Sequence, residues 1–186
     1  FSRTTRALNL HYATSKLSGM GLCDAYNKQF KTNFLSLIPS NPFGPFDDFS
    51  DTNSHVIPGL INRIHKAKKN KKKKVIIWGS GKPIRDFIFA EEVINASIKI
   101  MKSKKKFDII NVSSRDIYSI KDLVMIIKDI IKFEGKIVFD QSKPDGTAFK
   151  SLNNSDLKKL GWEKKYLFRD SLVKTYKWYL KSKYND

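Results

Sequence analysis

Apolar residues recur at helical spacing in the N-terminal part of the chain. Within residues 11–32 they are Leu22, Cys23, Tyr26 and Phe30. This spacing predicts a long helix. Gly19 and Gly21 each destabilise such a helix by roughly 1 kcal/mol, so we expect them to mark close packing against another backbone.

The next apolar run, NFLSLIPS at residues 33–40, ends near Pro39. A short continuous apolar run is typical of a buried parallel strand. The following segment, NPFGPFDDFSDTNS, is dense in Pro, Gly, Asn and Asp and predicts a loop over residues 41–54. Asn53 or Ser54 could cap the helix that follows it.

Strands and helices alternate through the rest of the chain. The predicted strands cover residues 75–81 with a glycine turn, 85–89, 107–113 and 136–140. The predicted helices cover residues 91–101, a segment after Ser119, and residues near 155–160 and 168–182. The segment after Ser119 begins like a capping box with Asp122. Its apolar stripe consists of Leu123, Ile126, Ile127, Ile130 and Ile131. The alternation indicates an α/β fold.

A glycine-rich phosphate loop is missing from this order of elements. No G-x-x-G-x-x-G motif occurs in the sequence, and the first predicted element is a helix rather than a strand. If the fold binds a nucleotide, we expect its first half to lie outside this sequence. We then expect the chain alone to be an incomplete, inactive fragment.

Composition excludes several classes of protein. A chain of 186 residues with 40% hydrophobic residues can bury roughly 70% of the surface that its unfolded form exposes. No apolar run approaches the ~18 residues of a membrane span, and residues 1–10 lack the apolar block of a secretory signal. Cys23 is the single cysteine, so no internal disulfide can form. We expect a cytoplasmic protein without a membrane partner.

The net charge of +18 raises nucleic acid as a partner. However, 30 of the 36 basic residues are lysines, and they concentrate at residues 65–74 and 102–106. Arginine forks and interleaved aromatic residues, which read and stack bases, are missing from both runs. We interpret the runs as solvated surface and do not expect nucleic acid, although a phosphate-binding role stays open.

Tyr12 and Lys16 are the first candidates for chemistry. At positions i and i+4 of a helix their Cβ atoms lie about 5–6 Å apart on one face. A phenol with an ordinary pKa of about 10 is a poor acid–base group near neutral pH unless a nearby ammonium group stabilises the phenolate. An ordinary amphipathic helix could also contain this pair.

Several motifs appear together in one order: YATSKLSG, LIPSNPFGP, RDFIFAEEV, INVSS and YSIKDL. In order and spacing they resemble the extended short-chain dehydrogenase/reductase family. More narrowly, NSHVIPGLINRIHKA, IIWGSGKPIRDFIF, KPDGTAFKSLN and LKKLGW resemble the GDP-L-fucose synthase branch of that family. The resemblance runs from about Tyr12 to the C-terminus.

The resemblance implies the C-terminal part of a Rossmann-like enzyme with its smaller substrate-binding subdomain. Residues 1–10 are then an atypical N-terminal stretch, and residues 11–54 form the end of the dinucleotide-binding domain. Residues 55–186 are mainly the substrate-binding subdomain, from which the strand at 107–113 returns to the Rossmann sheet. The family's catalytic serine and cysteine have no match here, and we expect Cys23 to be a buried core thiol.

The resemblance also implies a reaction. NADPH-dependent 3,5-epimerisation and 4-reduction would convert GDP-4-keto-6-deoxy-D-mannose to GDP-L-fucose. In such an enzyme the tyrosine that corresponds to Tyr12 donates a proton to the C4 alkoxide. The lysine that corresponds to Lys16 lowers the pKa of this tyrosine and holds the nicotinamide ribose. His55 matches the histidine that acts in epimerisation. Family members form homodimers through the helix that bears the tyrosine.

By the same resemblance, the NADP-binding residues are Lys16, Pro39, Ser40, Asn41 and His55, and no metal is expected. The substrate-binding residues are Arg63, Trp78, Arg85, Lys143 and Asp145.

Each of these assignments has a structural alternative. Trp78 could pack in its strand, Arg85 could pair with Asp86 or another acid, and Asp145 could serve a turn. His11 and His65 receive no functional role. At the level of the whole chain, a non-catalytic GDP-sugar-binding domain and a basic nucleic-acid-binding domain remain alternatives.

Overall fold

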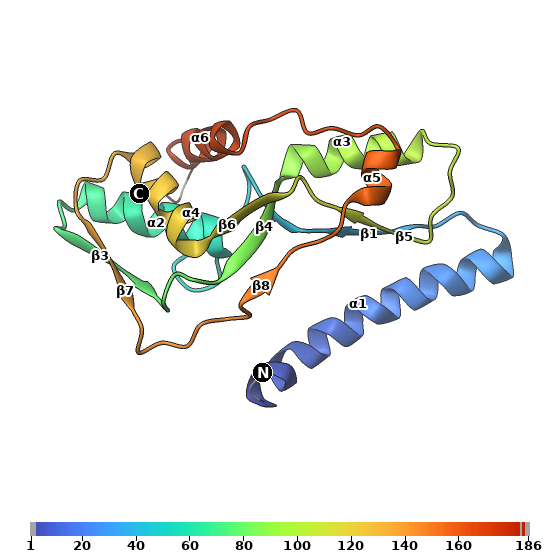
Figure 1. Cartoon of the computed structure of the whole chain (residues 1–186), viewed down its shortest axis with the longest axis horizontal. Helices are drawn as coiled ribbons and strands as arrows, with labels where there is room; N and C mark the ends of the chain where they lie inside the picture. The colour runs from blue at the N-terminus through green and yellow to red at the C-terminus, as the bar shows by residue number, and fades with distance from the viewer. Residues whose placement is uncertain (1–2, 183, 185–186) are drawn as a thin grey trace.

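The computed structural model describes residues 3–182 and 184, with side chains from residue 10 onward. The first two residues of the stretch 1–10 therefore lie outside the described residues. The chain alternates helices and strands, as the sequence predicted. The helix α1 (Arg3–Phe30) extends along one side of the molecule, apart from the body that the other elements form (Figure 1).

Parallel strand pairs are the basis of the body. β1 (Ser36–Pro39) pairs with β5 (Ile109–Val112), and β3 (Lys74–Trp78) pairs with β7 (Lys136–Asp140). The central strand β4 (Ile84–Phe89) pairs along one edge with β2 (Asn41–Phe43) and β8 (Phe149–Lys150). Its other edge pairs antiparallel with β6 (Asp116–Ser119).

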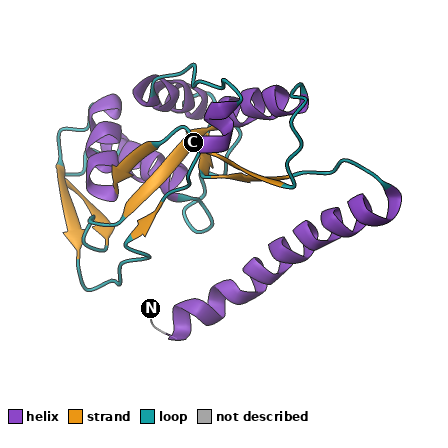
Figure 2. Cartoon of the chain, turned by 45° about the vertical axis from the view of Figure 1, so that its right-hand side comes forward, coloured by secondary structure: helices purple, strands orange, loops and turns teal. Residues whose placement is uncertain are grey.

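Helices cover these strands (Figure 2). They are α2 (Val56–Lys69), α3 (Ala90–Met101), α4 (Ile120–Ile131), α5 (Ser155–Lys159) and α6 (Phe168–Tyr179). None of the described helices combines the length and the apolar character that crossing a membrane requires.

Strand β4 serves two hydrophobic cores because successive side chains of a strand point to opposite faces. Phe87 and Phe89 enter the larger core, which α2, α4 and α6 cover. Ile88 enters the smaller core beneath α3 and α5. The central strand therefore fixes the position of both halves of the body.

The predicted start of α4 is confirmed. Ser119 Oγ accepts a hydrogen bond from the Asp122 amide at 3.0 Å, which satisfies one of the free amides of the first turn. Leu123, Ile127 and Ile131 of the predicted stripe are buried in the larger core. Here local pattern and tertiary packing agree.

The predicted start of α2 is wrong in detail. The residue at the N-cap is His55, and no side chain caps the helix there. Ser54 instead packs against the backbone, since a Cβ built on Gly59 would lie 2.6 Å from Ser54 Oγ. Neither Asn53 nor Ser54 therefore serves as the expected cap.

Three short strands, β2, β6 and β8, were missed. Pro42 lies within β2, which pairs only at the edge of β4 over the described residues, and an edge strand tolerates proline. The expectation for Gly19 and Gly21 is also wrong, because a Cβ at either position would meet no described atom within 4 Å.

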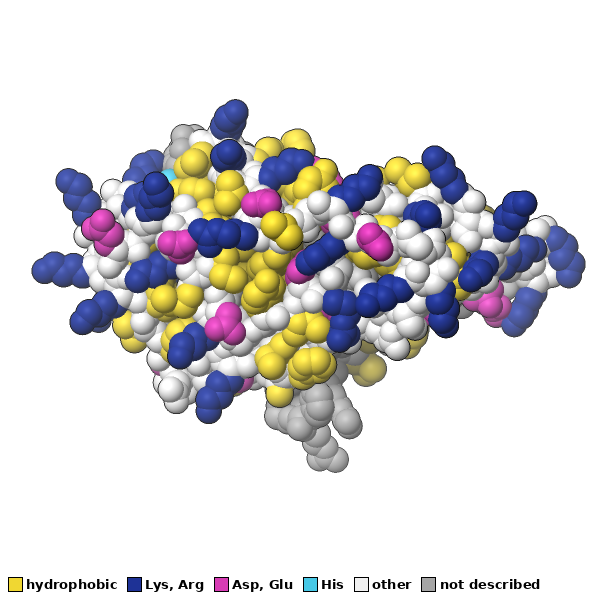
Figure 3. Space-filling view, turned by 45° about the horizontal axis from the view of Figure 1, so that its top comes forward, with side chains coloured by type: hydrophobic (Ala, Val, Ile, Leu, Met, Phe, Trp, Pro, Cys, Tyr) yellow, Lys and Arg dark blue, Asp and Glu magenta, His cyan; other side chains and the backbone are white. Residues whose placement is uncertain are grey.

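The lysine runs lie at the surface, as expected. Lysine and arginine side chains project into solvent across the face shown in Figure 3, with apolar patches between them.

Candidate active site

Tyr12 and Lys16 share one face of α1. Lys16 Nζ lies 5.4 Å from the centroid of the Tyr12 ring, and Tyr12 is 67% exposed. An ammonium group at this distance from the ring is attracted to its negatively polarised face. The pair thus has the geometry that the sequence predicted, although its catalytic role stays a prediction.

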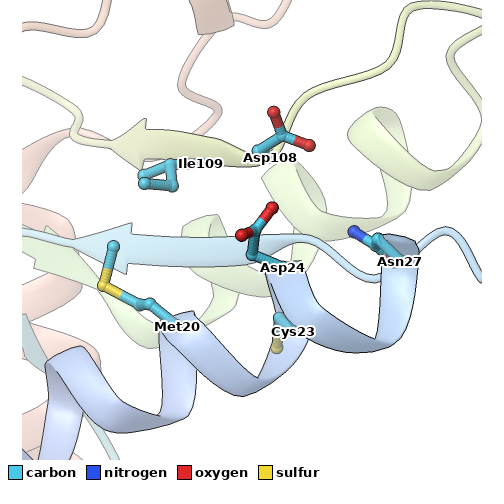
Figure 4. A pocket seen from close by; sticks show the side chains of 6 residues that line it. All are labelled: Met20, Cys23, Asp24, Asn27, Asp108 and Ile109. Atoms are coloured by element: carbon cyan, nitrogen blue, oxygen red, sulfur yellow. The ribbon is translucent and has the colours of Figure 1, made fainter. Parts of the chain in front are cut away.

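The stripe of α1 that bears Lys16 continues toward the body. Lys16, Met20, Cys23 and Asn27 follow at intervals of three or four residues, so they lie on one side of the helix. Met20, Cys23, Asp24 and Asn27 line a small pocket of about 190 Å³ with Asp108 and Ile109, and Figure 4 shows Met20 and Asp24 pointing toward the strands.

The same pocket corrects the expectation for the cysteine. Cys23 is a free thiol of intermediate exposure on α1 and lines the pocket wall. It is not a buried core thiol, because it faces this pocket between α1 (Figure 1) and the residues Asp108 and Ile109, where its side chain stays partly accessible.

The loop after β1 is held at the carboxyl ends of parallel strands, where ligands of open α/β sheets bind. Pro39 is exposed at the end of β1. The Ser40 amide donates to Val112 O at 2.9 Å, and Asn41 Nδ2 donates to Asp86 O at 2.6 Å. Ser40 Oγ is buried and has no hydrogen-bond partner among the described residues.

His55 occupies the N-cap position of α2 with its side chain 83% exposed. Its Nδ1 lies 3.7 Å from Asp47 Oδ1, a long contact. The imidazole is therefore accessible to solvent and to ligands. His65, by contrast, contacts Tyr176 Oη at 2.9 Å and packs against Tyr179, which agrees with a structural role.

Trp78 is 66% exposed at the end of β3, so the alternative of a packed strand residue is wrong. Arg63 from α2 stacks near it, with Cζ 5.8 Å from the ring centroid. Buried and exposed residues alternate along β3, which places Trp78 on the outer face. The pair offers a flat aromatic surface beside a positive charge.

Arg85 is half-buried and has no carboxylate partner among the described residues. Its Nη1 donates to Ile84 O at 2.7 Å and to Thr147 O at 2.6 Å. Burial lowers the pKa of Arg85 from its ordinary value, yet an arginine remains charged. The expected alternative of a salt bridge to Asp86 is therefore wrong.

Asp145 holds the glycine turn after β3. Its carboxyl oxygens accept hydrogen bonds from the Ser80 amide at 2.8 Å and from Ser80 Oγ at 2.6 Å, and these bonds lower the pKa of Asp145. Gly79 has φ +84°, and a Cβ there would lie 2.4 Å from Asp145 Oδ1. The neighbouring Lys143 is exposed, and its amide donates to Asp140 O at 3.3 Å.

The residues form separate groups rather than one contact network. The segment 145–147 connects two of them, because Asp145 accepts a hydrogen bond from Ser80 and Thr147 O accepts one from Arg85. The Asn41 side chain donates to the backbone oxygen of Asp86, the residue after Arg85 in β4. Among the described residues, Tyr12, Lys16 and His55 form no hydrogen bond or ion pair with these groups.

Asp86 is the residue that the sequence analysis missed. It is 0% exposed, and its carboxyl group accepts hydrogen bonds from Ser113 Oγ at 2.8 and 3.0 Å, Ser151 Oγ at 3.1 Å and the Leu152 amide at 3.1 Å. Arg115 Nη1 bonds Ser151 Oγ at 2.9 Å. An aspartate inside the apolar run RDFIF was the available signal, since buried acids need several partners.

Replacing Ser80 with alanine should raise the pKa of Asp145 part of the way toward its ordinary value, because it removes the hydroxyl that contributes most to the charged carboxylate while the amide of residue 80 still donates. A depressed pKa stabilises the folded state above the unfolded-state pKa, and this stabilisation is lost as the pH falls through the folded-state pKa. Carboxyl ¹³C NMR titration of the wild type and Ser80→Ala measures the change.

Ser142→Ala is the matched control for this titration, because Ser142 lowers the pKa of Asp140 in the same way. It should raise the pKa of Asp140 and leave that of Asp145 unchanged. An Asp145 titration that is identical in the wild type and Ser80→Ala would contradict the assignment of the turn.

Solved structures with a similar fold include proteins named as GDP-sugar enzymes. A GDP-L-fucose synthetase from Naegleria fowleri bound to NADP has a TM-score of 0.84 and 32% identity, and the match covers 91% of this chain and 55% of that one. A GDP-6-OMe-4-keto-L-xylo-heptose reductase from C. jejuni has a TM-score of 0.80 and 29% identity over 90% of this chain and 60% of that one.

Curated sequences agree. The chain is 38% identical over 94% of its length to a probable GDP-L-fucose synthase 1 from Oryza sativa subsp. japonica, of which it covers 53%. It is 36% identical over 96% of its length to the GDP-L-fucose synthase of Escherichia coli strain K12, of which it covers 59%. The chain thus spans about half the length of the curated relatives it matches. Residues 3–113 match the NAD dependent epimerase/dehydratase family, and the chain belongs to that family.

Proposed function

We propose that this chain carries the tyrosine helix and the substrate-binding part of an NADPH-dependent enzyme. The enzyme converts GDP-4-keto-6-deoxy-D-mannose to GDP-L-fucose by 3,5-epimerisation and 4-reduction. The observation that carries the proposal is the pairing of Lys16 Nζ with the exposed Tyr12 ring at 5.4 Å. The names of the relatives support the substrate. We place the reaction in the cytoplasm, a reducing compartment with which the single cysteine of this chain agrees.

In this proposal Tyr12 is the proton donor for the reduction. Its hydroxyl gives a proton to the C4 oxygen as that oxygen becomes an alkoxide. The adjacent Lys16 ammonium group then stabilises the phenolate that remains. Bound NADPH supplies the hydride.

The cofactor residues in the proposal are Lys16, Pro39, Ser40, Asn41 and His55. The buried Ser40 hydroxyl supports a polar ligand at this edge of the sheet, since a buried hydroxyl without a partner destabilises the fold. Asn41 is fixed by its bond to Asp86 O, so the loop is preorganised. Lys16 would hold the ribose.

His55 is the proposed acid–base group for epimerisation. Its imidazole is exposed, and a histidine exchanges protons near neutral pH more readily than other side chains.

The substrate residues offer charges suited to a nucleoside diphosphate. Arg85 without a carboxylate partner, together with Arg63 and Lys143, would bind phosphate oxygens. The exposed face of Trp78 would pack against the flat guanine base. Both carboxyl oxygens of Asp145 already accept hydrogen bonds from Ser80. We therefore assign Asp145 to positioning the turn.

We further propose that the enzyme is a homodimer that pairs through α1. Large apolar side chains on this helix are exposed, namely Leu10, Leu17, Leu22, Tyr26 and Phe30. Leu10 and Leu17, seven residues apart, share one face of the helix, and Leu22, Tyr26 and Phe30, at intervals of four, share another. Exposed apolar surface of this kind is typical of protein interfaces.

Tyr12→Phe should abolish turnover while leaving the fold intact. Because the sequence contains no phosphate-binding glycine loop, the assay joins the N-terminal half of the E. coli relative to this chain. NADPH oxidation is then followed with GDP-4-keto-6-deoxy-D-mannose. Loss of a positioned proton donor should lower kcat at least about 100-fold, whereas Tyr26→Phe on the same helix should leave kcat unchanged.

An unchanged rate in Tyr12→Phe would show that the tyrosine assignment is wrong. Binding of GDP-fucose by calorimetry without turnover in any such fusion would favour the non-catalytic GDP-sugar-binding alternative instead.

Leu17→Lys should weaken self-association, because it places a charge in the proposed apolar interface. Sedimentation equilibrium should show a dimer for the wild type and a dissociation constant at least about tenfold higher for the variant. Met101→Lys is the control, since Met101 is also an exposed apolar residue but lies on α3. A wild type that stays monomeric, or equal effects of the two variants, would contradict the proposal.

A further inference from the structure

Two lysine-bearing turns meet at one end of the body. One turn joins α2 to β3, and the other joins α4 to β7 (at the left in Figure 1). The two strands begin side by side, since Lys74 pairs with Lys136. The Lys136 amide also donates to Lys73 O at 2.9 Å, so the turns are bonded directly to each other.

Both turns have the same fixed backbone. Lys71 has φ 49° and Lys132 has φ 58°, in the left-handed region that ends many helices. The amide of the next residue returns to its helix in each case, from Lys72 to Ala67 O at 2.9 Å and from Phe133 to Lys128 O at 3.1 Å. The side chains therefore project from a rigid frame.

Between the turns lies an open groove of about 590 Å³. Its lining residues are Lys68, Lys71, Lys72, Lys73, Lys132, Phe133, Glu134, Gly135 and Lys136. Six lysines against one glutamate give a net charge of +5. Lys68 Nζ donates to Ile131 O at 2.7 Å, while the ammonium groups of the other five lysines form no ion pair within the described residues.

Helix ends do not neutralise this charge. The C-termini of α2 and α4 both lie at the groove, and each contributes roughly −0.5 of an elementary charge. About four positive charges remain in excess. Such a cluster repels itself and lowers the stability of the fold until an anion binds.

We propose that this groove binds a small oligophosphate, an anion with three or more linked phosphate groups. Lysine ammonium groups bind phosphate oxygens as point charges, and several together favour a multivalent anion. The groove offers no exposed ring for a base, because its aromatic residue, Phe133, is 5% exposed, and single-stranded nucleic acid needs stacking surfaces.

The groove is distinct from the proposed substrate site. Its lining residue Lys73 directly precedes Lys74, the first residue of β3, whereas Trp78 ends the same strand. Four residue steps of an extended strand separate the two by about 13 Å. Binding in the groove therefore tests a property that is independent of the proposed reaction.

The test uses inorganic tripolyphosphate and the chain itself in isothermal titration calorimetry at low salt. The triple variant Lys71→Gln, Lys72→Gln, Lys73→Gln should weaken binding at least about tenfold. The control variant Lys104→Gln, Lys105→Gln, Lys106→Gln removes the same charge from the other lysine run and should change the affinity less than about twofold. Circular dichroism should be unchanged in both, because all six side chains are exposed.

An equal loss of tripolyphosphate affinity in the two triple variants would overturn the proposal, since the net charge of the chain alone would then explain binding. Absence of saturable binding to the wild type would also overturn it. So would stronger competition by a single-stranded oligonucleotide at equal phosphate concentration, because a nucleic acid would then be the occupant.

Discussion

The buried carboxyl group of Asp86 connects parts of the chain that are far apart in sequence. It lies within β4 and accepts hydrogen bonds from Ser113 after β5 and from Ser151 and Leu152 after β8. A carboxyl group is strongly disfavoured in an apolar interior unless donors surround it. These donors must therefore stay in place for β4 to occupy the centre of the body.

This constraint also places the candidate site. The backbone oxygen of Asp86 receives the Asn41 side chain at 2.6 Å, which fixes the loop on the proposed cofactor side. The preceding residue, Arg85, points to the other face of the strand and bonds the segment at Thr147. Adjacent residues of one strand thus hold the cofactor loop and the proposed phosphate-binding arginine in a fixed relation.

Much of the fold could be predicted because its signals are local. The stripe and cap of α4, the apolar runs of the longer strands and the Tyr12–Lys16 spacing all depend on residues close in sequence. The strands β2, β6 and β8 could not, because each is short and exists through pairing with β4. The role of Asp86 was missed for the same reason, because the hydrogen-bond donors to its carboxyl group lie 27 to 66 residues away in the sequence.

The wrong expectations have a shared physical origin. Cys23, Gly19 and Gly21 were expected to be packed, yet α1 contacts the body along only one part of its length. For Trp78 the alternative was packing in its strand, yet its ring is exposed. For Arg85 the alternative was an ion pair with an acid, yet its hydrogen bonds go to backbone carbonyl oxygens. Exposure depends on what covers an element in space, which helical spacing does not report.

Urea unfolding of Asp86→Ala tests most directly whether this carboxyl group holds the body together. Removing it leaves the Ser113 and Ser151 hydroxyls and the Leu152 amide without their acceptor, so the free energy of unfolding should fall by about 3 kcal/mol. Asp108→Ala, at an exposed position, should change it by less than about 0.5 kcal/mol. A loss in Asp86→Ala as small as that of the control would contradict the account.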